Sequence, residues 1–266
     1  MEKGVFEAKK KDGTRYYRSS ITYQNKHISL GSFPDEKTAS LCYQTAGELL
    51  SNHTLSLSDY QNESPLSFSK WVVLINFRDN HIYIKTPIYL YRHYFRYYFS
   101  FDDFYIFDID DLFYFSTRTI SRRGGHLFVA DYGMQVNVLS RYGIKNYGVP
   151  GKDFEFMNGN ERDFRYANIK IINRFQGVCQ KEKGNTTYYE AKIHWNGNFL
   201  IGRYQTEIEA AIAYNKAASI LIKKGYIKNY PVNYIESLSS EEYRRIFKQI
   251  TISDTIRNLT VRQEHR

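Results

Sequence analysis

The chain contains an internal repeat, with one copy near each end. Residues 4–33 and 177–204 both run from Gly-Val through a basic turn and an aromatic pair to an aliphatic-Gly-x-aromatic ending. The offset between matched residues is 173 at Gly4 and Gly177 and 171 at Gly31 and Gly202, a drift that small loop deletions produce. Self-similarity of this kind predicts one supersecondary unit built twice. It constrains the fold more than any other feature of the sequence.

Each copy has the pattern of a three-stranded antiparallel sheet backed by one helix. In the first copy, residues 17, 19 and 21 alternate with exposed types, which is the period of a half-buried strand. In the second copy, Asn196-Gly197 is a strong hairpin signal. Thr206 and Glu209 form a capping box that begins a helix. Alanines at 210, 213 and 217 then recur along one side of that helix, which allows its close approach to a sheet.

One face of each sheet is expected to stay open, with basic residues on it. The chain has a formal net charge of +9, which favours a polyanionic partner because Lys and Arg release counterions from phosphates. A twisted sheet of this width can enter the major groove of DNA; the alternative is a solvated face with ordinary charges. The candidates on the open faces are Arg18, Lys26, His27, Lys192 and His194, with Trp195 and Arg203 close by. The candidates at the hairpin tips are Lys9, Lys11, Arg15, Lys181 and Lys183.

Aromatic residues and cysteines bear on the class of protein. The chain has 25 Tyr and 18 Phe, an abundance that an AT-rich genome explains, whereas aromatic platforms for bases need local support. Only Cys42 and Cys179 are present, so a disulfide framework is excluded and a reducing compartment is favoured. No apolar run has the length of a membrane span or the form of a signal peptide. A cytoplasmic protein without a membrane partner is therefore expected.

The middle of the chain is expected to be rich in strands. Residues 53–69 contain Ser and Asn with a Pro and are predicted to be a linker. Residues 92–98 interleave basic side chains with rings, which is typical of a strand that alternates core and surface; base stacking is the alternative. The five aspartates between 102 and 111 are expected to face solvent or cap turns, with a metal site as the alternative.

The repeated residues resemble the AP2/ERF DNA-binding domain. The shared features are Gly-Val, aromatic-x-Ala/Ser-x-Ile, aliphatic-Gly-x-aromatic and an alanine-rich helix, at 209–218 in the second copy and more loosely at 37–43 in the first. The resemblance covers roughly 45 residues at each end. It implies that each sheet reads DNA.

Residues 153–170 resemble the HNH homing endonucleases of phages and mobile elements. The matching stretches are 155–160, 163–165 and 168–170, and the resemblance extends over residues 70–172. It implies a ββα-metal core in which Glu155, Asp163 and Asn168 would donate oxygen ligands to Mg²⁺. Members of this family often carry an AP2 module on the C-terminal side of the nuclease.

The departures from the HNH pattern predict that cleavage has been lost. The family's histidine deprotonates the attacking water, but Phe156 stands at its place, and Ser140 and Phe164 replace another histidine and an asparagine. A phenyl ring cannot accept a proton. His126 is a candidate substitute base, although a histidine after two glycines is more typical of a surface turn. No catalytic residue or cofactor is therefore assigned, and the magnesium site is expected to be vestigial.

These observations predict an α+β chain of five parts. The parts are an AP2-like module at 1–52, a linker at 53–69, a degenerate HNH-like domain at 70–172, a second AP2-like module at 173–235, and a C-terminal helix and tail at 236–266. The predicted function is binding of nucleic acid, double-stranded DNA above all, by a degenerate homing endonuclease. Two alternatives stay open. One is an active Mg²⁺-dependent endonuclease, and the other is a protein-binding inhibitor or accessory factor, such as an anti-CRISPR inhibitor of host defence or a component of an RNA–protein particle.

Overall fold

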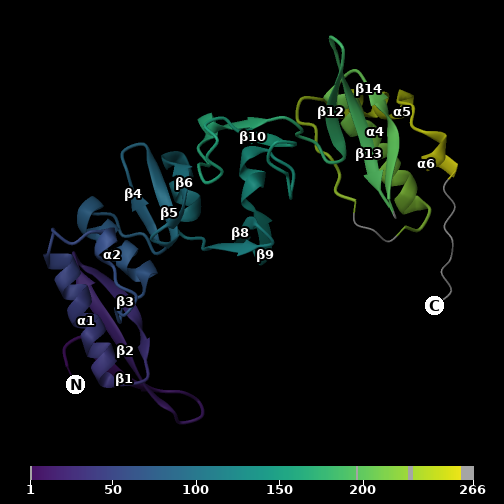
Figure 1. Ribbon diagram of the computed structural model, residues 1–266. Helices are drawn as coiled ribbons and strands as arrows, with labels where there is room; N and C mark the ends of the chain where they lie inside the picture. The colour runs from purple at the N-terminus through teal and green to yellow at the C-terminus, as the bar shows by residue number, and fades with distance from the viewer. Residues whose placement is uncertain (1, 196, 227–229, 259–266) are drawn as a thin grey trace. The chain divides into compact units, whose positions relative to one another are not determined.

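The computed structural model (Figure 1) describes residues 2–195, 197–226 and 230–258. The chain divides into two compact units. Unit 1 comprises residues 1–136 and 160–168, and unit 2 comprises residues 137–159 and 169–266. Each unit combines small antiparallel sheets with helices, so the predicted α+β class is confirmed. Residues of the predicted central domain, 70–172, belong to both units: 70–136 and 160–168 to unit 1, and 137–159 and 169–172 to unit 2. No helix in the described ranges is long and apolar enough to cross a membrane.

Module 1, at the start of unit 1, is a three-stranded antiparallel sheet with one helix on one face (Figure 1). Strands β1 (Val5–Lys9), β2 (Arg15–Tyr23) and β3 (Lys26–Phe33) pair in chain order, and helix α1 (Glu36–Ser51) follows. Asp35 caps the helix by accepting a hydrogen bond from the Thr38 amide at 2.7 Å. The apolar sides of helix and sheet meet in a buried core that includes Ile21, Ile28, Leu30, Cys42, Ala46 and Leu49.

Module 2, in unit 2, repeats this arrangement. Strands β12 (Val178–Lys183), β13 (Thr186–His194) and β14 (Asn198–Tyr204) pair in chain order, and α4 (Glu207–Lys223) covers one face of the sheet. The predicted capping box is confirmed, because the Glu209 amide donates to Thr206 Oγ1 at 3.1 Å and the Thr206 amide donates to the Glu209 carboxylate at 3.2 Å. Of the predicted hairpin signal, Asn196 lies outside the described residues.

The two modules share details beyond strand order, which confirms the internal repeat. A β-bulge interrupts the pairing of the second and third strands at matched positions, 19–20 and 191–192. Gly4 and Gly177 both have a positive φ, 78° and 72°, and both press against a helix tyrosine, Tyr43 and Tyr214 respectively. A residue with a side chain would be strained at such a φ and would collide with the ring.

Residues 53–69, which the sequence predicts to be a linker, pack against module 1. The segment contains the one-turn helix η1 (Leu57–Asp59) and leads into α2 (Phe68–Asn80). Its aliphatic residues join the core of module 1, and Leu66 among them is fully buried. Trp71 of α2 donates from Nε1 to the Ser56 carbonyl at 3.0 Å. The polar composition suggested exposure, but the apolar side chains within it are buried against an available apolar surface.

Arg78 ties the end of α1 to α2. Its side chain is 3% exposed, and its guanidinium donates to the backbone carbonyls of Leu49 at 2.9 Å, Asn52 at 2.7 Å and Leu55 at 2.8 Å. Its Nε donates to the Asp79 carboxylate at 2.7 Å. These bonds satisfy carbonyls at and beyond the C-terminus of α1, where the helix itself supplies no donors.

Unit 1 contains two further small sheets. Strands β4 (Ile88–Leu90), β5 (Tyr94–Ser100) and β6 (Asp103–Asp108) form one, and β7 (Ile120–Arg123), β8 (His126–Asp131) and β9 (Met134–Asn137) form the other. The short helices are η2 (Ile109–Asp111), α3 (Leu112–Phe115) and η4 (Tyr166–Asn168). Stacked and tilted rings fill the core between β5, β6 and α3, where Phe107 lies 5.5 Å from Phe95 and 4.5 Å from Phe115 between ring centroids.

Unit 2 adds a short hairpin and two C-terminal helices to module 2. The turn helix η3 (Val138–Tyr142) precedes β10 (Phe154–Phe156), which pairs with β11 (Ile169–Ile171), so the HNH-like segment contains a hairpin. Residues 172–177, all of them described, contain no helix, so the helix of a ββα-metal motif does not follow this hairpin. Helices α5 (Ser240–Gln249) and α6 (Asp254–Asn258) pack on α4. The first confirms the predicted C-terminal helix.

We expect Arg78→Ala to lower the free energy of unfolding by about 3–5 kcal/mol, because it leaves buried carbonyls and a carboxylate without their donor. Urea unfolding followed by circular dichroism measures this loss. Arg92 is an exposed arginine of the same unit, and Arg92→Ala should change the free energy by less than about 0.5 kcal/mol. Equal losses in the two variants would contradict the role given to Arg78.

We also expect Gly177→Ala to be more destabilising than Gly184→Ala. Both glycines have a positive φ, 72° and 60°, so both variants carry backbone strain. A Cβ at Gly177 would in addition collide with the Tyr214 ring and the Lys192 carbonyl, whereas at Gly184 it would meet no atom within 4 Å. The difference between the variants should be about 2 kcal/mol by thermal unfolding. If Gly184→Ala costs as much, close packing of the glycine against the helix is not what the position requires.

Candidate nucleic-acid interface

The sheet of module 2 presents a set of basic side chains on the side away from α4. Alternate residues of a strand point to opposite faces, and the strand register brings one such set together. The set, named here the basic face, consists of Lys181, Lys183, Tyr188, Glu190, Lys192, His194 and Arg203. Its Lys, Arg and His residues are all exposed. The other side of the sheet carries the apolar residues that pack on α4, among them Ala191, Ile193 and Ile201.

Glu190 lies at the centre of the basic face and pairs with two of its cations. Its carboxylate is 2.8 Å from Lys192 Nζ and 3.1 Å from Arg203 Nε. The Glu190 side chain is 9% exposed, against 45% for Lys192 and 64% for Arg203, so the two cations cover it. The hydrogen bond from Lys192 is the main cause that holds the pKa of Glu190 below its ordinary value of 4.5; Arg203 adds to the effect and burial opposes it.

Sequence reasoning named the cations of this face but missed its carboxylate. Tyr188, Glu190 and Lys192 occupy every second position of β13, so the strand period places all three on the same side of the sheet. The signal was therefore present in the sequence.

The rest of the basic face offers cationic groups together with an aromatic ring. Lys181 and Lys183 form no ion pair with any residue that the structure describes. The Arg203 guanidinium lies over the Tyr188 ring, with Cζ 5.9 Å from the ring centroid. His194 Nδ1 is 3.1 Å from an Asn198 side-chain oxygen at the far end of the sheet. The cations are thus distributed along the whole length of β12 to β14.

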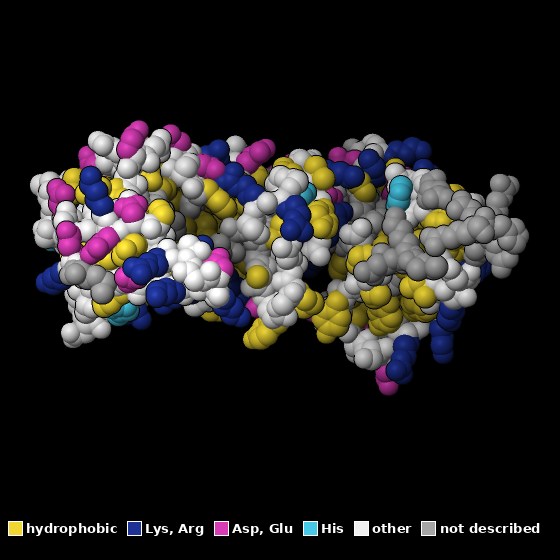
Figure 2. Space-filling view, turned by 90° about the horizontal axis from the view of Figure 1, so that it is seen from below, with side chains coloured by type: hydrophobic (Ala, Val, Ile, Leu, Met, Phe, Trp, Pro, Cys, Tyr) yellow, Lys and Arg dark blue, Asp and Glu magenta, His cyan; other side chains and the backbone are white. Residues whose placement is uncertain are grey.

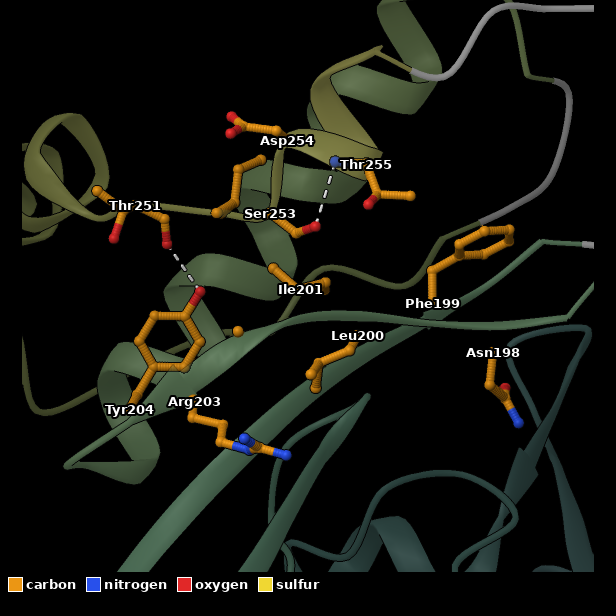
Figure 3. Close-up of a pocket in the computed structure, with 12 residues that line it drawn as sticks. Asn198, Phe199, Leu200, Ile201, Arg203, Tyr204, Thr251, Ser253, Asp254 and Thr255 are labelled. Carbon is orange, nitrogen blue, oxygen red and sulfur yellow. Dashed lines mark hydrogen bonds between the residues drawn. The ribbon is translucent and has the colours of Figure 1, made fainter.

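A C-terminal segment packs beside β14 without covering the basic face (Figure 3). The Ser253 amide donates to the Ile201 carbonyl at 2.8 Å, and the Tyr204 hydroxyl donates to the Thr251 carbonyl at 2.8 Å. Figure 3 shows the Arg203 side chain on the opposite side of the strand from Thr251. The segment therefore protects the outer edge of the sheet and leaves the cations accessible.

Trp195, which was predicted to lie close to the open face, is half-buried and packs against the core of module 2. Its ring lies 5.9 Å from the Phe199 ring at an interplanar angle of 28°, and 4.7 Å from the Tyr226 ring at 67°. Trp195 lies two positions after the buried Ile193, and this even spacing directs it to the helix side. An aromatic residue of this size gains more from burial there than it would on an open sheet.

The open face of module 1 carries few cations. Of the predicted residues, Arg18 and His27 lie on it, and the Arg18 guanidinium donates to the Tyr16 hydroxyl at 2.7 Å. The other residues on this face are mainly hydroxyl-bearing, with one exposed ring; they include Phe6, Ser20, Thr22, Ser29 and Ser32. The two modules therefore share a fold but present chemically different faces.

Lys26 lies on the helix side of the module 1 sheet, so its predicted position on the open face is wrong. Its register partner is Tyr23, and its Nζ lies 5.0 Å from the centroid of the Tyr83 ring. Gln24 and Asn25 both have a positive φ and form a two-residue turn. Such a turn places the residues that flank it directly opposite each other and on the same side of the sheet, so Lys26 follows Tyr23.

The hairpin of module 1 holds the remaining predicted cations. Lys9 and Arg15 are register partners at the ends of β1 and β2, and Lys11 lies in the loop between them. All three are exposed, and Arg15 Nε lies 3.4 Å from the Glu7 carboxylate. Figure 2 shows acidic and basic side chains interspersed over the surface of unit 1. The positive charge of module 1 is thus gathered at its hairpin and not on its sheet.

The predicted metal ligands each interact with another residue of the chain. In unit 2, the Glu155 carboxylate lies 3.6 Å from Lys170 Nζ. In unit 1, both carboxylate oxygens of Asp163 accept hydrogen bonds from Arg165, at 2.8 and 2.6 Å, and the Asn168 amide donates to the Asp163 carbonyl at 2.8 Å. No group of three or more His, Cys, Asp or Glu side chains in the described ranges is placed to hold a metal ion. The vestigial magnesium site stays a prediction.

The positions that match the HNH histidines hold no base. Phe156 ends β10, and the Ser140 hydroxyl donates to the Asn137 carbonyl at 2.7 Å. His126, the candidate substitute, begins β8 in unit 1 opposite Arg123.

The aromatic strand β5 alternates between core and surface only in part, because Tyr98 is buried next to the buried Tyr97 and Arg96 is half-buried. Phe95 and Tyr97 are buried, whereas Arg96 points to the other face, with its Cζ 4.3 Å from the Phe104 ring centroid and 5.1 Å from that of Tyr91. In the acidic stretch nearby, Asp108 accepts a hydrogen bond from the Tyr166 amide at 2.6 Å and Asp103 pairs with Arg122. These two aspartates therefore support local structure.

We expect the pKa of Glu190 to rise towards 4.5 in a Lys192→Ala variant, because that substitution removes the main hydrogen bond to the carboxylate. A carbon-13 NMR titration of the side-chain carboxyl measures this shift. Since the pKa is lowered in the folded protein, the stabilisation by Glu190 is present above pH 4.5 and is lost as the pH falls through the lowered value. An unchanged titration in Lys192→Ala would show that the ion pair does not form in solution.

Comparison with known proteins gives no support for a function of these surfaces. No family model matches the chain, and no match was found among curated proteins or solved structures. The likeness of the repeats to AP2/ERF domains, and of residues 153–170 to HNH nucleases, is therefore confined to the motifs themselves.

Proposed function

We propose that the protein binds nucleic acid, and double-stranded DNA in particular, through the basic face of module 2. The observation that carries this proposal is the gathering of Lys181, Lys183, Lys192 and Arg203 on one exposed side of a single sheet. Phosphates attract such groups because each contact releases condensed counterions. The excess of Lys and Arg over Asp and Glu, 37 against 28, agrees with an anionic partner.

The contact proposed for this sheet is with the major groove of the duplex. The major groove of B-DNA is about 12 Å wide and admits a β-ribbon, and sheet-reading proteins place strands there with Arg and Lys towards guanine edges. The resemblance of the repeats to AP2/ERF domains supports the same use of the sheet. Module 1 contributes less to binding in this proposal, because its cations lie at the hairpin and only Arg18 and His27 are on its open face.

The origin proposed for the chain is a homing endonuclease of a phage or mobile element that has kept DNA binding and lost cleavage. The motif at 155–170 and the hairpin that contains it support this origin. Phe156 in place of the water-activating histidine supports the loss of cleavage. A cytoplasmic location is part of the proposal, since the cysteines Cys42 and Cys179 are both free thiols.

We expect binding of a fluorescent 20-base-pair duplex to weaken steeply between about 50 and 200 mM salt, because the contacts are ionic. The double variant Lys181→Ala with Lys183→Ala, which removes two exposed cations of the basic face, should weaken binding at least about tenfold. It should also reduce the slope of log affinity against log salt by about 1.8, since each phosphate contact contributes about 0.9. Fluorescence anisotropy measures both quantities.

The control for this experiment removes the same charge elsewhere in unit 2. Lys223 of α4 and Arg244 of α5 are exposed and lie on helices away from the basic face. The variant Lys223→Ala with Arg244→Ala should therefore bind almost as the unaltered protein does. Equal weakening in both double variants, or an affinity that does not respond to salt, would contradict binding by the basic face.

A further inference from the structure

The carboxylate of Glu190 stands where a phosphate-binding surface would be expected to hold only cations. It lies on the central strand, accepts hydrogen bonds from Lys192 and Arg203, and is almost buried beneath them. The matched residue of module 1 is Arg18, 172 positions earlier, which is exposed on the same side of an equivalent sheet. The fold therefore does not require an acid at this position.

We propose that Glu190 is a specificity-determining residue of the basic face, which suppresses sequence-independent binding to the phosphate backbone and favours duplexes that offer an amino group to its carboxylate. This inference rests on the proposed function. The ligand chemistry it names is the exocyclic amine of cytosine or adenine in a major groove, because carboxylates accept hydrogen bonds from such amines.

The physical basis is competition between two anions for the same cations. A phosphate that takes Lys192 or Arg203 must displace Glu190, and the displaced carboxylate is left nearly buried and close to a second negative charge. Contact with the backbone alone therefore gains little at these two residues. A duplex that also donates a hydrogen bond to the Glu190 carboxylate replaces the cation that the carboxylate has lost. Duplexes without such a donor leave the carboxylate unpaired and are therefore disfavoured.

The face has two parts in this scheme. Lys181 and Lys183 have no ion-pair partner in the described parts of the chain, so they are available to any phosphate. Lys192 and Arg203 are available only when Glu190 is satisfied by other means. General attraction and discrimination are therefore assigned to different residues of the same sheet.

Glu190→Gln tests the inference, because it keeps the shape of the side chain and removes its charge. The matched control is Glu182→Gln, which makes the same change of charge on an exposed residue of β12 that faces the other side of the sheet. The probes are a pool of random-sequence duplexes and a duplex enriched from that pool by the unaltered protein. Anisotropy titrations give the affinity of each variant for each probe as a function of salt.

We expect Glu190→Gln to bind the random pool about tenfold more tightly and with a salt slope steeper by about 0.9, as one more phosphate contact would give. Its preference for the enriched duplex over the pool should fall by a similar factor, and Glu182→Gln should leave the preference unchanged. Weaker or unchanged binding of the pool by Glu190→Gln overturns the inference. So does an unaltered protein that binds DNA but enriches no sequence.

Failure of the proposed function is distinct, because the unaltered protein would then bind neither probe. Thermal unfolding of each variant checks that the sheet is intact. If Glu190→Gln does not fold, Glu190→Thr serves in its place, since threonine suits a strand, with the same outcomes for and against.

Discussion

The packing of a small-residue helix face against one side of a three-stranded sheet is the interaction on which both modules depend. Alanines at 46, 210, 213 and 217 bring helix and sheet together, and Gly4 and Gly177 let a helix tyrosine lie directly on the strand backbone. A helix this close buries the apolar residues of one face. Among the residues that the structure describes, no second helix covers the other face, and its Lys and Arg side chains are exposed.

The repeat fixes the fold of the two modules but leaves their open faces free to differ. Further helices pack on the helix of each module: α2 on α1 in module 1, with Arg78 bonded to the end of α1, and α5 and α6 on α4 in module 2. The open side of module 2 has become cationic around a central Glu190, whereas that of module 1 carries hydroxyl groups around Arg18. Duplication has thus preserved the core and allowed the surface chemistry to diverge.

Sequence reasoning anticipated what depends on local pattern. Strand alternation, the capping box at Thr206 and the helix after Ser239 are encoded by neighbouring residues, and all three are present. It failed where the direction of a side chain depends on a turn or on tertiary packing. Lys26 lies on the other side of the sheet than predicted because a two-residue turn sets its direction. The burial of the apolar residues in 53–69 was not predicted because most of their neighbours in the sequence are polar. Glu155 belongs to unit 2 and Asp163 to unit 1, and this division depends on contacts between residues that are distant in the sequence.

A natural cysteine, Cys179, can report whether nucleic acid covers the open sheet of module 2. Cys179 lies on that side opposite Glu190 and is partly exposed, whereas Cys42 is fully buried in module 1 and serves as an internal reference. The most direct measurement is the rate at which a small alkylating reagent modifies Cys179, with and without a saturating DNA duplex. The account predicts strong slowing at Cys179 when the duplex is bound. An unchanged rate at Cys179 in a protein that is demonstrably bound to DNA would contradict it.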